Sequence, residues 1–429
     1  MENKFKKILK KIGPGFITGA ADDDPSGIAT YSQTGAIFGF SQLWMALFSF
    51  PFMLVVQQMC GRIGMVTGKG LAGVIRENYP KPILYFSVSL LVITNTINIG
   101  ADLGAMASSA QMLVGLPITL WLCVITGFII LLEILVSYKT YSKILKYLAL
   151  SLLAYVLTAF IIKPDWLLIS KSTVLPQIQI SSNYLLNVVA ILGTTISPYL
   201  FFWQASEEVE DEISQGKLTD IGAEIPIVTK NNVLSMDFDT VIGMFFSQAI
   251  MFFIIVTTAA TLHANGITNI ATATDAAQAL RPMAGNLTYL LFAIGIIGTG
   301  LLAVPILAGA SAYAISETIG WKEGLSKKFA TAPGFYIVIA ASTLIGMLIN
   351  WVGIDPMKAL YYAAALNGVV AAPLIILLIF IANNKKIMGG FVNNRLSNIL
   401  AWIIAVVMVA AGIALIVSMF QGLGAPPKK

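Results

Sequence analysis

The chain has 429 residues, of which 57% are hydrophobic and 11% charged, and its mean hydropathy is +0.83. This composition excludes a soluble globular protein of this size. Apolar runs of about 20 residues, which are long enough to cross a bilayer, recur along the whole chain, and they are continuous rather than alternating, which excludes a β-barrel. The net charge of +5 reflects orientation in the membrane, and no nucleic-acid partner is expected. The composition predicts an all-α integral membrane protein.

The apolar runs predict eleven transmembrane helices. They cover residues 15–37, 42–66, 83–113, 117–137, 144–162, 185–206, 240–262, 287–315, 334–352, 358–382 and 397–420. If the N-terminus is cytoplasmic, 20 of the 26 Lys and Arg residues lie on the cytoplasmic side, as the positive-inside rule requires. We therefore expect a multi-pass protein of the cell inner or plasma membrane, with a cytoplasmic N-terminus and an extracellular C-terminus.

The first span carries acids and a proline where the centre of the bilayer should be. Asp22, Asp23 and Asp24 precede Pro25. Carboxylates inside a membrane are costly and usually functional, and proline removes a backbone donor and disfavours helix just before it. The pattern predicts a helix broken at mid-membrane with a carboxylate at the break, as in the substrate sites of many secondary transporters. The alternative is a span that begins after Pro25 with the acids in water.

The sixth span repeats this pattern. Pro198 lies in its middle, beside Thr194, Thr195 and Ser197. Taken alone, Pro198 is also compatible with a plain kink whose free carbonyls are satisfied by these hydroxyls. Two proline-broken spans, each opening a block of five, indicate a 5+5 inverted repeat of the leucine-transporter type (APC superfamily) with one extra span.

This architecture divides the chain into five parts. They are a basic cytoplasmic N-terminus (1–14), a first five-helix repeat (15–162), an extracellular loop (163–184), a second repeat (185–382) that contains a cytoplasmic acidic loop (207–239), and the last helix with the C-terminus (383–429).

The residues at the two breaks favour a hard cation. Span one supplies carboxylates, span six supplies hydroxyls and carbonyls, and no basic residue lies near either break. Mg²⁺ and Ca²⁺ prefer such oxygen ligands, whereas softer metals gain from sulfur or imidazole. Neither break carries Met or Cys, and the single histidine, His263, ends span seven. These residues alone do not separate a divalent-metal site from a Na⁺ site that serves an organic substrate.

With these motifs, the chain resembles the NRAMP family of divalent metal transporters. The resemblance covers nearly the whole chain, including Gly13-Pro14-Gly15, Asp24-Pro25-Ser26-Gly27 (Asp-Pro-Gly-Asn in the family) and Ser197-Pro198-Tyr199 (Met-Pro-His in the family). It implies that Asp24 binds the metal and that Ala21 and Thr194 offer backbone carbonyls. Gly27 stands where the family has a binding asparagine, and Ser197 where it has a binding methionine.

Further departures from the family concern proton movement. Tyr199 replaces the family's histidine, and Ile99 stands where a proton-relay aspartate is expected, beside Asp102 at the position of a glutamate. These departures resemble the magnesium-transporting branch of the family, which implies Mg²⁺ and Mn²⁺ transport without proton coupling. A proton-coupled Mn²⁺/Fe²⁺ symporter and a cation-coupled symporter of amino acids or other organic solutes remain the alternatives.

Several other polar residues have two interpretations each. Asp22 and Asp23 are expected to turn towards a solvated vestibule, although either could assist Asp24. One face of span three carries Asn95, Asn98 and Asp102. This face either lines the ion pathway or forms a polar seam between helices. The same two interpretations apply to Asn367 of span ten.

Two remaining acidic features are expected at the cytoplasmic side. The run Glu207–Glu212 is expected to be a solvated face, with cation attraction as the alternative. Glu133 is expected to snorkel towards Lys139. No catalytic or nucleotide-binding motif is present, so the chain is expected to be a monomeric transporter rather than an enzyme. Its partners are the lipid bilayer and the transported ion, and it needs no cofactor.

Overall fold

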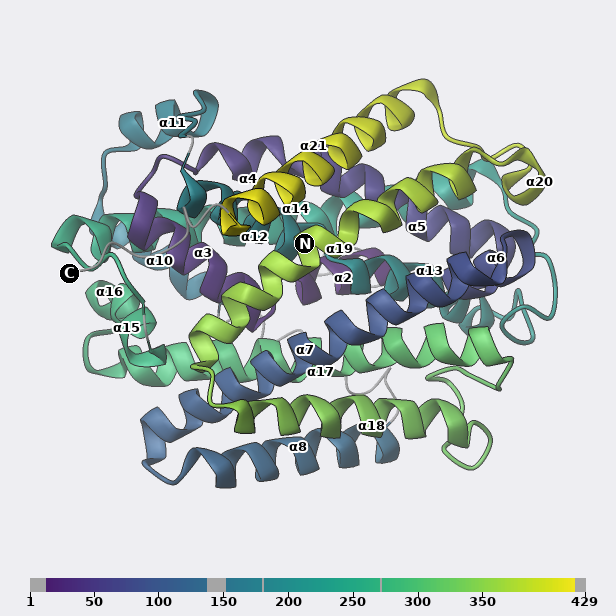
Figure 1. Ribbon diagram of the computed structural model, residues 1–429, viewed down its shortest axis with the longest axis horizontal. Coiled ribbons are helices and arrows are strands. Elements are labelled where there is room, and N and C mark those ends of the chain that lie inside the picture. Colours follow the sequence, from purple (N-terminus) through teal and green to yellow (C-terminus); the bar gives the residue numbers. More distant parts are fainter. Residues whose placement is uncertain (1–12, 137–151, 180, 271, 421–429) are drawn as a thin grey trace, which may run out of the picture.

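The computed structural model describes residues 13–136, 152–179, 181–270 and 272–420, and this part of the chain is built from helices and connecting turns (Figure 1). The helices of the first half are α2 (Pro14–Asp22), α3 (Pro25–Phe38), α4 (Trp44–Phe48), α5 (Phe50–Thr67), α6 (Leu71–Asn78), α7 (Lys81–Val114), α8 (Ile118–Leu135), α10 (Leu153–Ile162) and α11 (Trp166–Val174). Those of the second half are α12 (Ser182–Thr195), α13 (Pro198–Ser214), α14 (Lys230–Thr261), α15 (Ala273–Ala277), α16 (Arg281–Ala284), α17 (Thr288–Ile319), α18 (Pro333–Ile349), α19 (Pro356–Asn383), α20 (Lys385–Met388) and α21 (Arg395–Phe420). Short 3₁₀ turns, η2 (His263–Asn265) to η5 (Asn350–Val352), join some of them.

Within the described residues, nine helical segments are long and apolar enough to cross a membrane. Each of them coincides with one of the predicted spans. The first predicted span is split into α2 and α3, which are nine and 14 residues long and therefore too short to cross alone. The fifth, 144–162, is described only from residue 152, where α10 follows. The all-helical membrane architecture is confirmed, while the count of eleven stays a prediction.

Long helices surround the broken ones. Helices α7, α17, α18 and α8 lie side by side as an outer layer, and the broken pairs α2/α3 and α12/α13 lie inside the bundle, with α14 packed against α2 and α3 (Figure 1). Helix α19 packs against α3, α7 and α12, and α21 lies against α19. Both breaks are thereby enclosed by protein, where irregular backbone is tolerated in a membrane protein.

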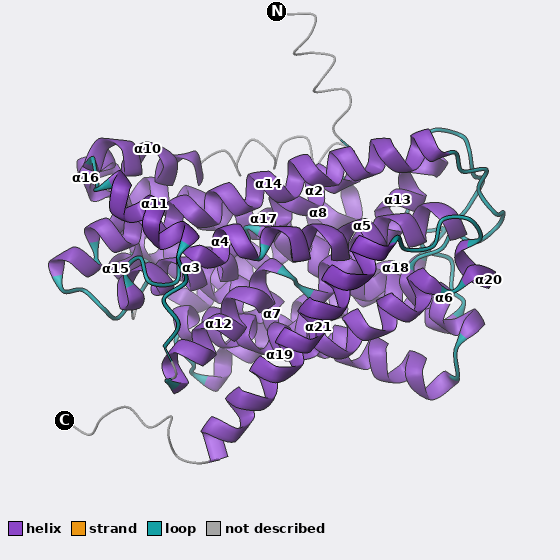
Figure 2. Cartoon of the chain, turned by 90° about the horizontal axis from the view of Figure 1, so that it is seen from above, coloured by secondary structure: helices purple, strands orange, loops and turns teal. Residues whose placement is uncertain are grey.

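The connections collect at two opposite ends of the bundle. Helices α6 and α20 lie at one end, and α10, α11, α15 and α16 lie at the other (Figure 2). The predicted topology assigns the first end to the cytoplasm. The predicted orientation depends partly on basic residues of the N-terminus and of segment 137–151, and these, like the C-terminal residues 421–429, lie outside the described residues.

Glycines bring α2 and α14 into backbone contact. Gly15 and Gly19 lie one turn apart on α2, and a Cβ atom added to Gly19 would lie 2.2 Å from the carbonyl carbon of Gly243. Small residues at a spacing of four allow such close approach between membrane helices. The Asp239 carboxylate of α14 also accepts hydrogen bonds from the backbone N–H groups of Gly13 and Phe16, at 3.0 and 3.3 Å, at the N-terminus of α2. Helices α2 and α14 are therefore a closely joined pair.

The substitution Gly19→Ala tests this packing. The added methyl group has no space at the helix contact, so we expect a loss of about 1–3 kcal/mol of stability and a lower thermal unfolding temperature in detergent. Gly127→Ala on α8 is the matched control, because a Cβ atom there meets nothing within 4 Å. Equal unfolding temperatures for the two variants would contradict the close contact.

The acidic segment after the sixth span differs from its prediction. Helix α13 continues to Ser214 and α14 begins at Lys230, so the connection is confined to 215–229 rather than 207–239. Glu207, Glu208 and Glu212 are only 7%, 3% and 2% exposed, so the expectation of a solvated face is wrong for them. The reason is that α13 lies between α5, α6 and α17 over this length.

Specific donors hold part of this acidic region. Glu208 accepts a hydrogen bond from Gln204 at 2.8 Å. Glu210 accepts hydrogen bonds from the Tyr313 hydroxyl and the Leu325 backbone N–H, each at 2.8 Å.

Glu133 of α8 is also buried, and both its carboxylate oxygens lack a partner in the described chain. Its expected partner, Lys139, lies outside the described residues.

Glu323, in the connection between α17 and α18, gives a pH-dependent test. Burial, followed by the nearby Glu317 carboxylate, raises its pKa from 4.5 to about 10, although Lys327 opposes this. The folded chain therefore holds a proton that the unfolded chain loses above pH 4.5, and the stability linked to that proton falls as the pH rises towards 10. We expect Glu323→Gln to raise the unfolding temperature increasingly from pH 5 to pH 8.

The control for this test is Glu77→Gln, which changes a half-exposed carboxylate paired with Lys69 at 2.5 Å. It should show no stabilisation that grows with pH. A Glu323→Gln variant whose unfolding temperature tracks that of the parent protein at every pH would contradict the buried, protonated state.

Candidate metal-binding site

The first break is made by the residues between α2 and α3. Asp23 ends α2 with φ −84° and ψ 51°, and Asp24 is extended with φ −68° and ψ 173°. The Asp24 carboxylate then acts as the N-cap of α3. Its Oδ1 accepts hydrogen bonds from the Gly27 backbone N–H at 2.7 Å and the Ser26 hydroxyl at 2.6 Å. An aspartate followed by proline is a strong helix start, so the same residues both break the span and fix the carboxylate.

The second break lies between α12 and α13. Ile196 and Ser197 are non-helical, and Pro198 opens α13. The Ser197 hydroxyl donates to the Gly193 and Thr194 carbonyls, at 2.8 and 2.9 Å. This back-bonding satisfies carbonyls that the interrupted helix leaves free, and it places Ser197 beside the Thr194 backbone oxygen.

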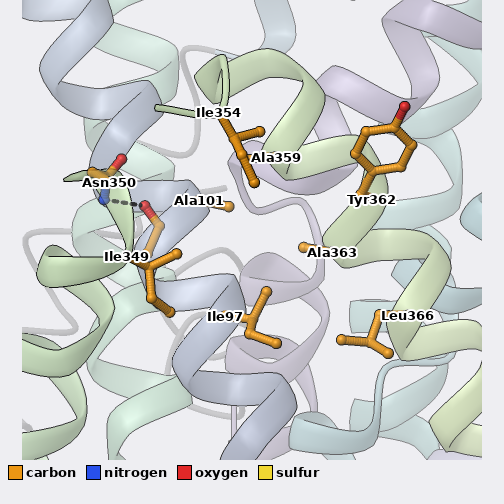
Figure 3. A pocket seen from close by; sticks show the side chains of 10 residues that line it. Ile97, Ala101, Ile349, Asn350, Ile354, Ala359, Tyr362, Ala363 and Leu366 are labelled. Carbon is orange, nitrogen blue, oxygen red and sulfur yellow. Dashed lines mark hydrogen bonds between the residues drawn. The ribbon is translucent and has the colours of Figure 1, made fainter. Parts of the chain in front are cut away.

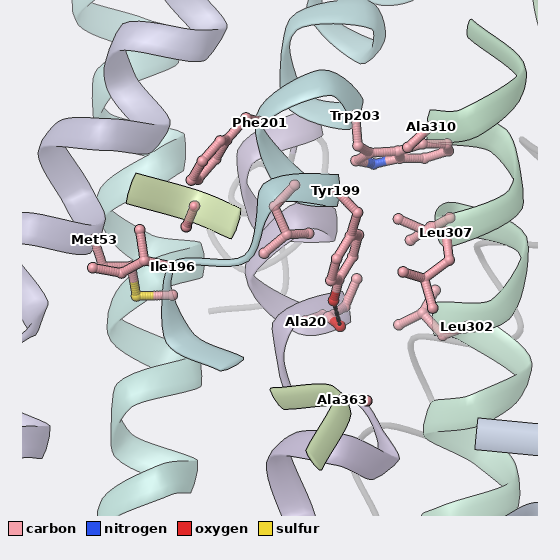
Figure 4. Packing of buried hydrophobic residues seen from close by; sticks show 14 of the residues in the cluster. Ala20, Met53, Ile196, Tyr199, Phe201, Trp203, Leu302, Leu307, Ala310 and Ala363 are labelled. Atoms are coloured by element: carbon pink, nitrogen blue, oxygen red, sulfur yellow. Dashed lines mark hydrogen bonds between the residues drawn. The ribbon is translucent and has the colours of Figure 1, made fainter. Parts of the chain in front are cut away.

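The structure brings the two breaks together. The Tyr199 hydroxyl, at the start of α13, donates to the Ala21 carbonyl of α2 at 3.0 Å, and the Tyr199 ring lies between α2 and α17 (Figure 4). A Cβ atom added to Gly27 would lie 3.3 Å from the Thr194 hydroxyl oxygen. The five residues predicted as the metal site, Asp24, Gly27, Ala21, Thr194 and Ser197, therefore lie at one junction.

Oxygen atoms dominate this junction. Asp24 is 2% exposed and Ser197 is 2% exposed, so both are buried within the bundle. The Ala21 and Thr194 carbonyls each accept one hydrogen bond already, and each keeps a second lone pair. In the part of the chain that the structure describes, no group of three or more His, Cys, Asp or Glu side chains is arranged to hold a metal ion. An ion bound here would take one carboxylate, neutral oxygens and water.

Asp22 and Asp23 do not face a vestibule as predicted. Both are fully buried, because α14 covers the end of α2. The Ser247 hydroxyl of α14 donates to Asp22 Oδ2 at 2.6 Å and lies 3.4 Å from Asp23 Oδ1. Sequence reasoning missed Ser247, a polar residue in an otherwise apolar span whose partner no local pattern reveals.

The polar face of α7 divides into two parts. Asn95 donates to the Leu307 carbonyl and the Ser311 hydroxyl, each at 3.0 Å, and Asn98 exchanges hydrogen bonds with Asn367 at 2.8 and 3.2 Å. These asparagines form a polar seam that joins α7 to α17 and α19.

Asp102 is different from the asparagines on its helix. It is fully buried, neither of its carboxylate oxygens has a partner among the described residues, and it lies within electrostatic range of Asp24. Ile99, one turn earlier on α7, is also fully buried and packs against Gly346 of α18. An apolar side chain therefore occupies the position at which the family resemblance predicts a proton-relay aspartate.

A cavity of about 160 Å³ lies to one side of the junction, between α7, η5 and α19. Its lining is largely apolar, with Ile97, Ile349 and Leu366 among the contributors, and the Asn350 amide closes one side by donating to the Gly100 carbonyl at 2.9 Å (Figure 3). This lining offers little to a cation, and we do not place the ion there.

The fold and the junction together define a class of protein. An all-helical membrane protein with two interrupted helices that meet inside the bundle, one of them carrying a carboxylate, has the architecture of a secondary transporter.

The particular family follows from comparison with known proteins. Residues 15–418 match the model of the natural resistance-associated macrophage protein-like (Nramp) family, and the chain belongs to this family. The divalent metal cation transporter MntH of Deinococcus radiodurans is 28% identical over 419 residues, which cover 94% of this chain and 89% of the relative. MntH of Yersinia pestis (strain Pestoides F) is 27% identical over 429 residues, which cover 97% of each chain. These relatives are named as transporters rather than enzymes, and their names imply no cofactor.

Solved structures share the fold. The Eremococcus coleocola manganese transporter, in complex with an aromatic bis-isothiourea compound, superposes with a TM-score of 0.80 at 15% identity, covering 100% of this chain and 90% of that one. Mhp1, a nucleobase-cation-symport-1 family transporter in a closed conformation, has a TM-score of 0.59 at 11% identity, covering 97% of this chain and 94% of that one. The likeness supports the leucine-transporter-like fold expected from the two broken spans.

Proposed function

We propose that this chain transports divalent metal cations across the membrane, and that it carries Mg²⁺ and also Mn²⁺ inward without proton coupling. Family membership and the names of the relatives support a divalent metal as the substrate. The observation that carries the preference for Mg²⁺ is the ligand set at the helix breaks. Apart from the Asp24 carboxylate, the two breaks offer only hydroxyl and carbonyl oxygens as ligands, and the positions that carry methionine and histidine in the family signature hold Ser197 and Tyr199.

Few oxygen lone pairs remain free at the junction, which fits an ion that keeps much of its water. Ala21 and Thr194 each have one carbonyl lone pair committed, and Asp24 Oδ1 already accepts two hydrogen bonds. Mg²⁺ dehydrates reluctantly and is usually held by one or two carboxylates with several waters. Without sulfur or imidazole, the site has no ligand that favours softer transition metals over Mg²⁺.

The absence of proton coupling is proposed from two positions. Ile99 offers no proton-accepting group. The Tyr199 hydroxyl donates a hydrogen bond to the Ala21 carbonyl, and a phenol does not accept protons as the imidazole of histidine does. Inward movement needs no second ion, because a negative-inside potential contributes about 2.3 kcal/mol per charge per 100 mV, and therefore about twice that for a divalent ion.

Alternating access is expected to move α2 together with α14. Their backbone contact at Gly19 and Gly243 and the bonds of Asp239 to the start of α2 join them as one body. We expect the bundle of the first, second, sixth and seventh spans (α2/α3, α4/α5, α12/α13 and α14) to rock against the rest of the protein. Apart from the acidic loop, which the structure shortens to 215–229, the predicted domain boundaries remain parts of the proposal, as do the cytoplasmic N-terminus and the monomeric state.

A proton-coupled Mn²⁺ symporter is the second candidate. Its support is Asp102, a buried carboxylate without a partner in the described chain that lies within electrostatic range of Asp24. Such a group could accept the proton that Asp24 releases when a cation binds there.

Uptake into proteoliposomes tests the proposal. We expect Mn²⁺ uptake that excess Mg²⁺ inhibits strongly, with no change in a luminal pH dye. Asp24→Asn keeps the size of the side chain but removes its charge, so uptake should fall to the level of empty liposomes. Acidification of the lumen in step with Mn²⁺ uptake would favour the second candidate, and normal uptake by Asp24→Asn would contradict the assignment of Asp24.

The variant Ser197→Met tests the origin of selectivity. Introducing a thioether at the break should shift the preference from Mg²⁺ towards Cd²⁺ and Mn²⁺, because sulfur favours softer ions. The measurement is competition of Mg²⁺ and Cd²⁺ with Mn²⁺ uptake. Gly27 is a poorer place for a new ligand, because even a Cβ atom there would lie 3.3 Å from Asp22 O, Thr194 Oγ1 and Tyr31 Cε2.

Unchanged competition by both ions in Ser197→Met would show that selectivity is set away from Ser197. Ser109→Met on α7 is a matched control, since it introduces the same side chain at a buried serine outside the junction.

A further inference from the structure

Asp22 and Asp23 are buried carboxyl groups that the proposed transport site does not use. Both are fully buried, and Asp22 Oδ1 and Asp23 Oδ2 have no hydrogen-bond partner in the described part of the chain. A buried carboxylate oxygen without a partner is costly, so these two atoms indicate that a binding partner is missing.

Ser247 joins the two carboxyl groups from α14. Its hydroxyl oxygen lies 2.6 Å from Asp22 Oδ2 and 3.4 Å from Asp23 Oδ1. A hydroxyl has one proton to donate and keeps two lone pairs, so Ser247 supplies an acceptor oxygen beside both carboxyl groups. The three oxygen-bearing side chains come from two helices that are in backbone contact, which gives the arrangement a fixed frame.

The end of α2 adds to the attraction for a cation. Asp22 is the last residue of α2 and Asp23 is its C-cap. The last carbonyls of a helix lack intrahelical donors and give its C-terminus a partial negative charge. The α2 terminus, the two carboxyl groups and the hydroxyl therefore all favour positive charge.

Buried carboxyl groups outnumber buried basic side chains around the helix breaks. Four carboxyl groups are buried in this region, those of Asp22, Asp23, Asp24 and Asp102. Among the described residues, Arg62 is the only buried basic side chain, and it is hydrogen-bonded to Asn393 and faces Asp237 instead. Neither Asp22 nor Asp23 therefore pairs with a basic side chain in the described part of the chain.

We propose that Asp22, Asp23 and Ser247 form a second site for a divalent hard cation, on the α14 side of the first helix break. Two carboxylates and a hydroxyl, completed by water or by carbonyls at the end of α2, are the ligands that Mg²⁺ and Mn²⁺ prefer. The proposal rests on the proposed function only in taking the same ion.

Equilibrium binding of ⁵⁴Mn²⁺ to the purified full chain in detergent tests the second site. We expect two ions per chain for the parent protein and one for the double variant Asp22→Asn with Asp23→Asn, which keeps both side-chain sizes. Asp24→Asn should also bind one ion. Ser247→Ala should keep two ions but weaken one of them about tenfold or more, since it removes a group that contacts charged atoms. Ser109→Ala, another buried serine, is the control and should match the parent protein.

A single Mn²⁺ in the parent protein, or two in the double Asn variant, would overturn the second site. A parallel measurement with ²²Na⁺ tests whether Asp22, Asp23 and Ser247 bind a monovalent cation instead of a divalent one. One Na⁺ per chain that disappears in the double variant, beside a single Mn²⁺, would also contradict a divalent ion here. If the one Mn²⁺ is lost in Asp24→Asn, the second site fails while the proposed function stands, and a chain that binds no Mn²⁺ contradicts both.

Discussion

The contact between the two helix breaks is the constraint on which the site depends. Tyr199 donates to the Ala21 carbonyl across the gap, and Gly27 leaves space for Thr194 to approach α3. Each break exposes carbonyls that a membrane protein must satisfy internally, and here each break supplies donors or neighbours for the other. Asp24 can be held in this region because the Gly27 N–H and the Ser26 hydroxyl bind its carboxylate while it caps α3.

Much of this arrangement is predictable from the chain itself. Asp24-Pro25 and Ser197-Pro198 locate both breaks, because an acid or hydroxyl before a proline is unfavourable inside a continuous membrane helix and favourable at a helix start. The long apolar runs locate most of the helices to within a few residues of the observed bounds, but the polar ends of α13 and α14 extend well beyond the runs. The family match and the shared fold with known transporters agree with the architecture expected from these two motifs.

Other features depend on contacts that no local pattern contains. Glu207, Glu208 and Glu212 look like a solvated acidic run, but neighbouring helices cover them because α13 is two turns longer than its apolar portion. The sequence favours a solvated vestibule for Asp22 and Asp23, but the small residues that let α14 approach α2 bury them instead. The hydrogen bond from Ser247 spans 225 positions in the sequence and is visible only in three dimensions.

The central claim is that one divalent ion binds where the breaks meet, with Asp24 as its carboxylate ligand. The most direct measurement is anomalous scattering from crystals of the protein grown with Mn²⁺. We predict a strong anomalous peak against the Asp24 carboxylate, between the start of α3 and the start of α13, that disappears in crystals of Asp24→Asn. The absence of a peak at this junction, or a peak there that persists in Asp24→Asn, would contradict the account.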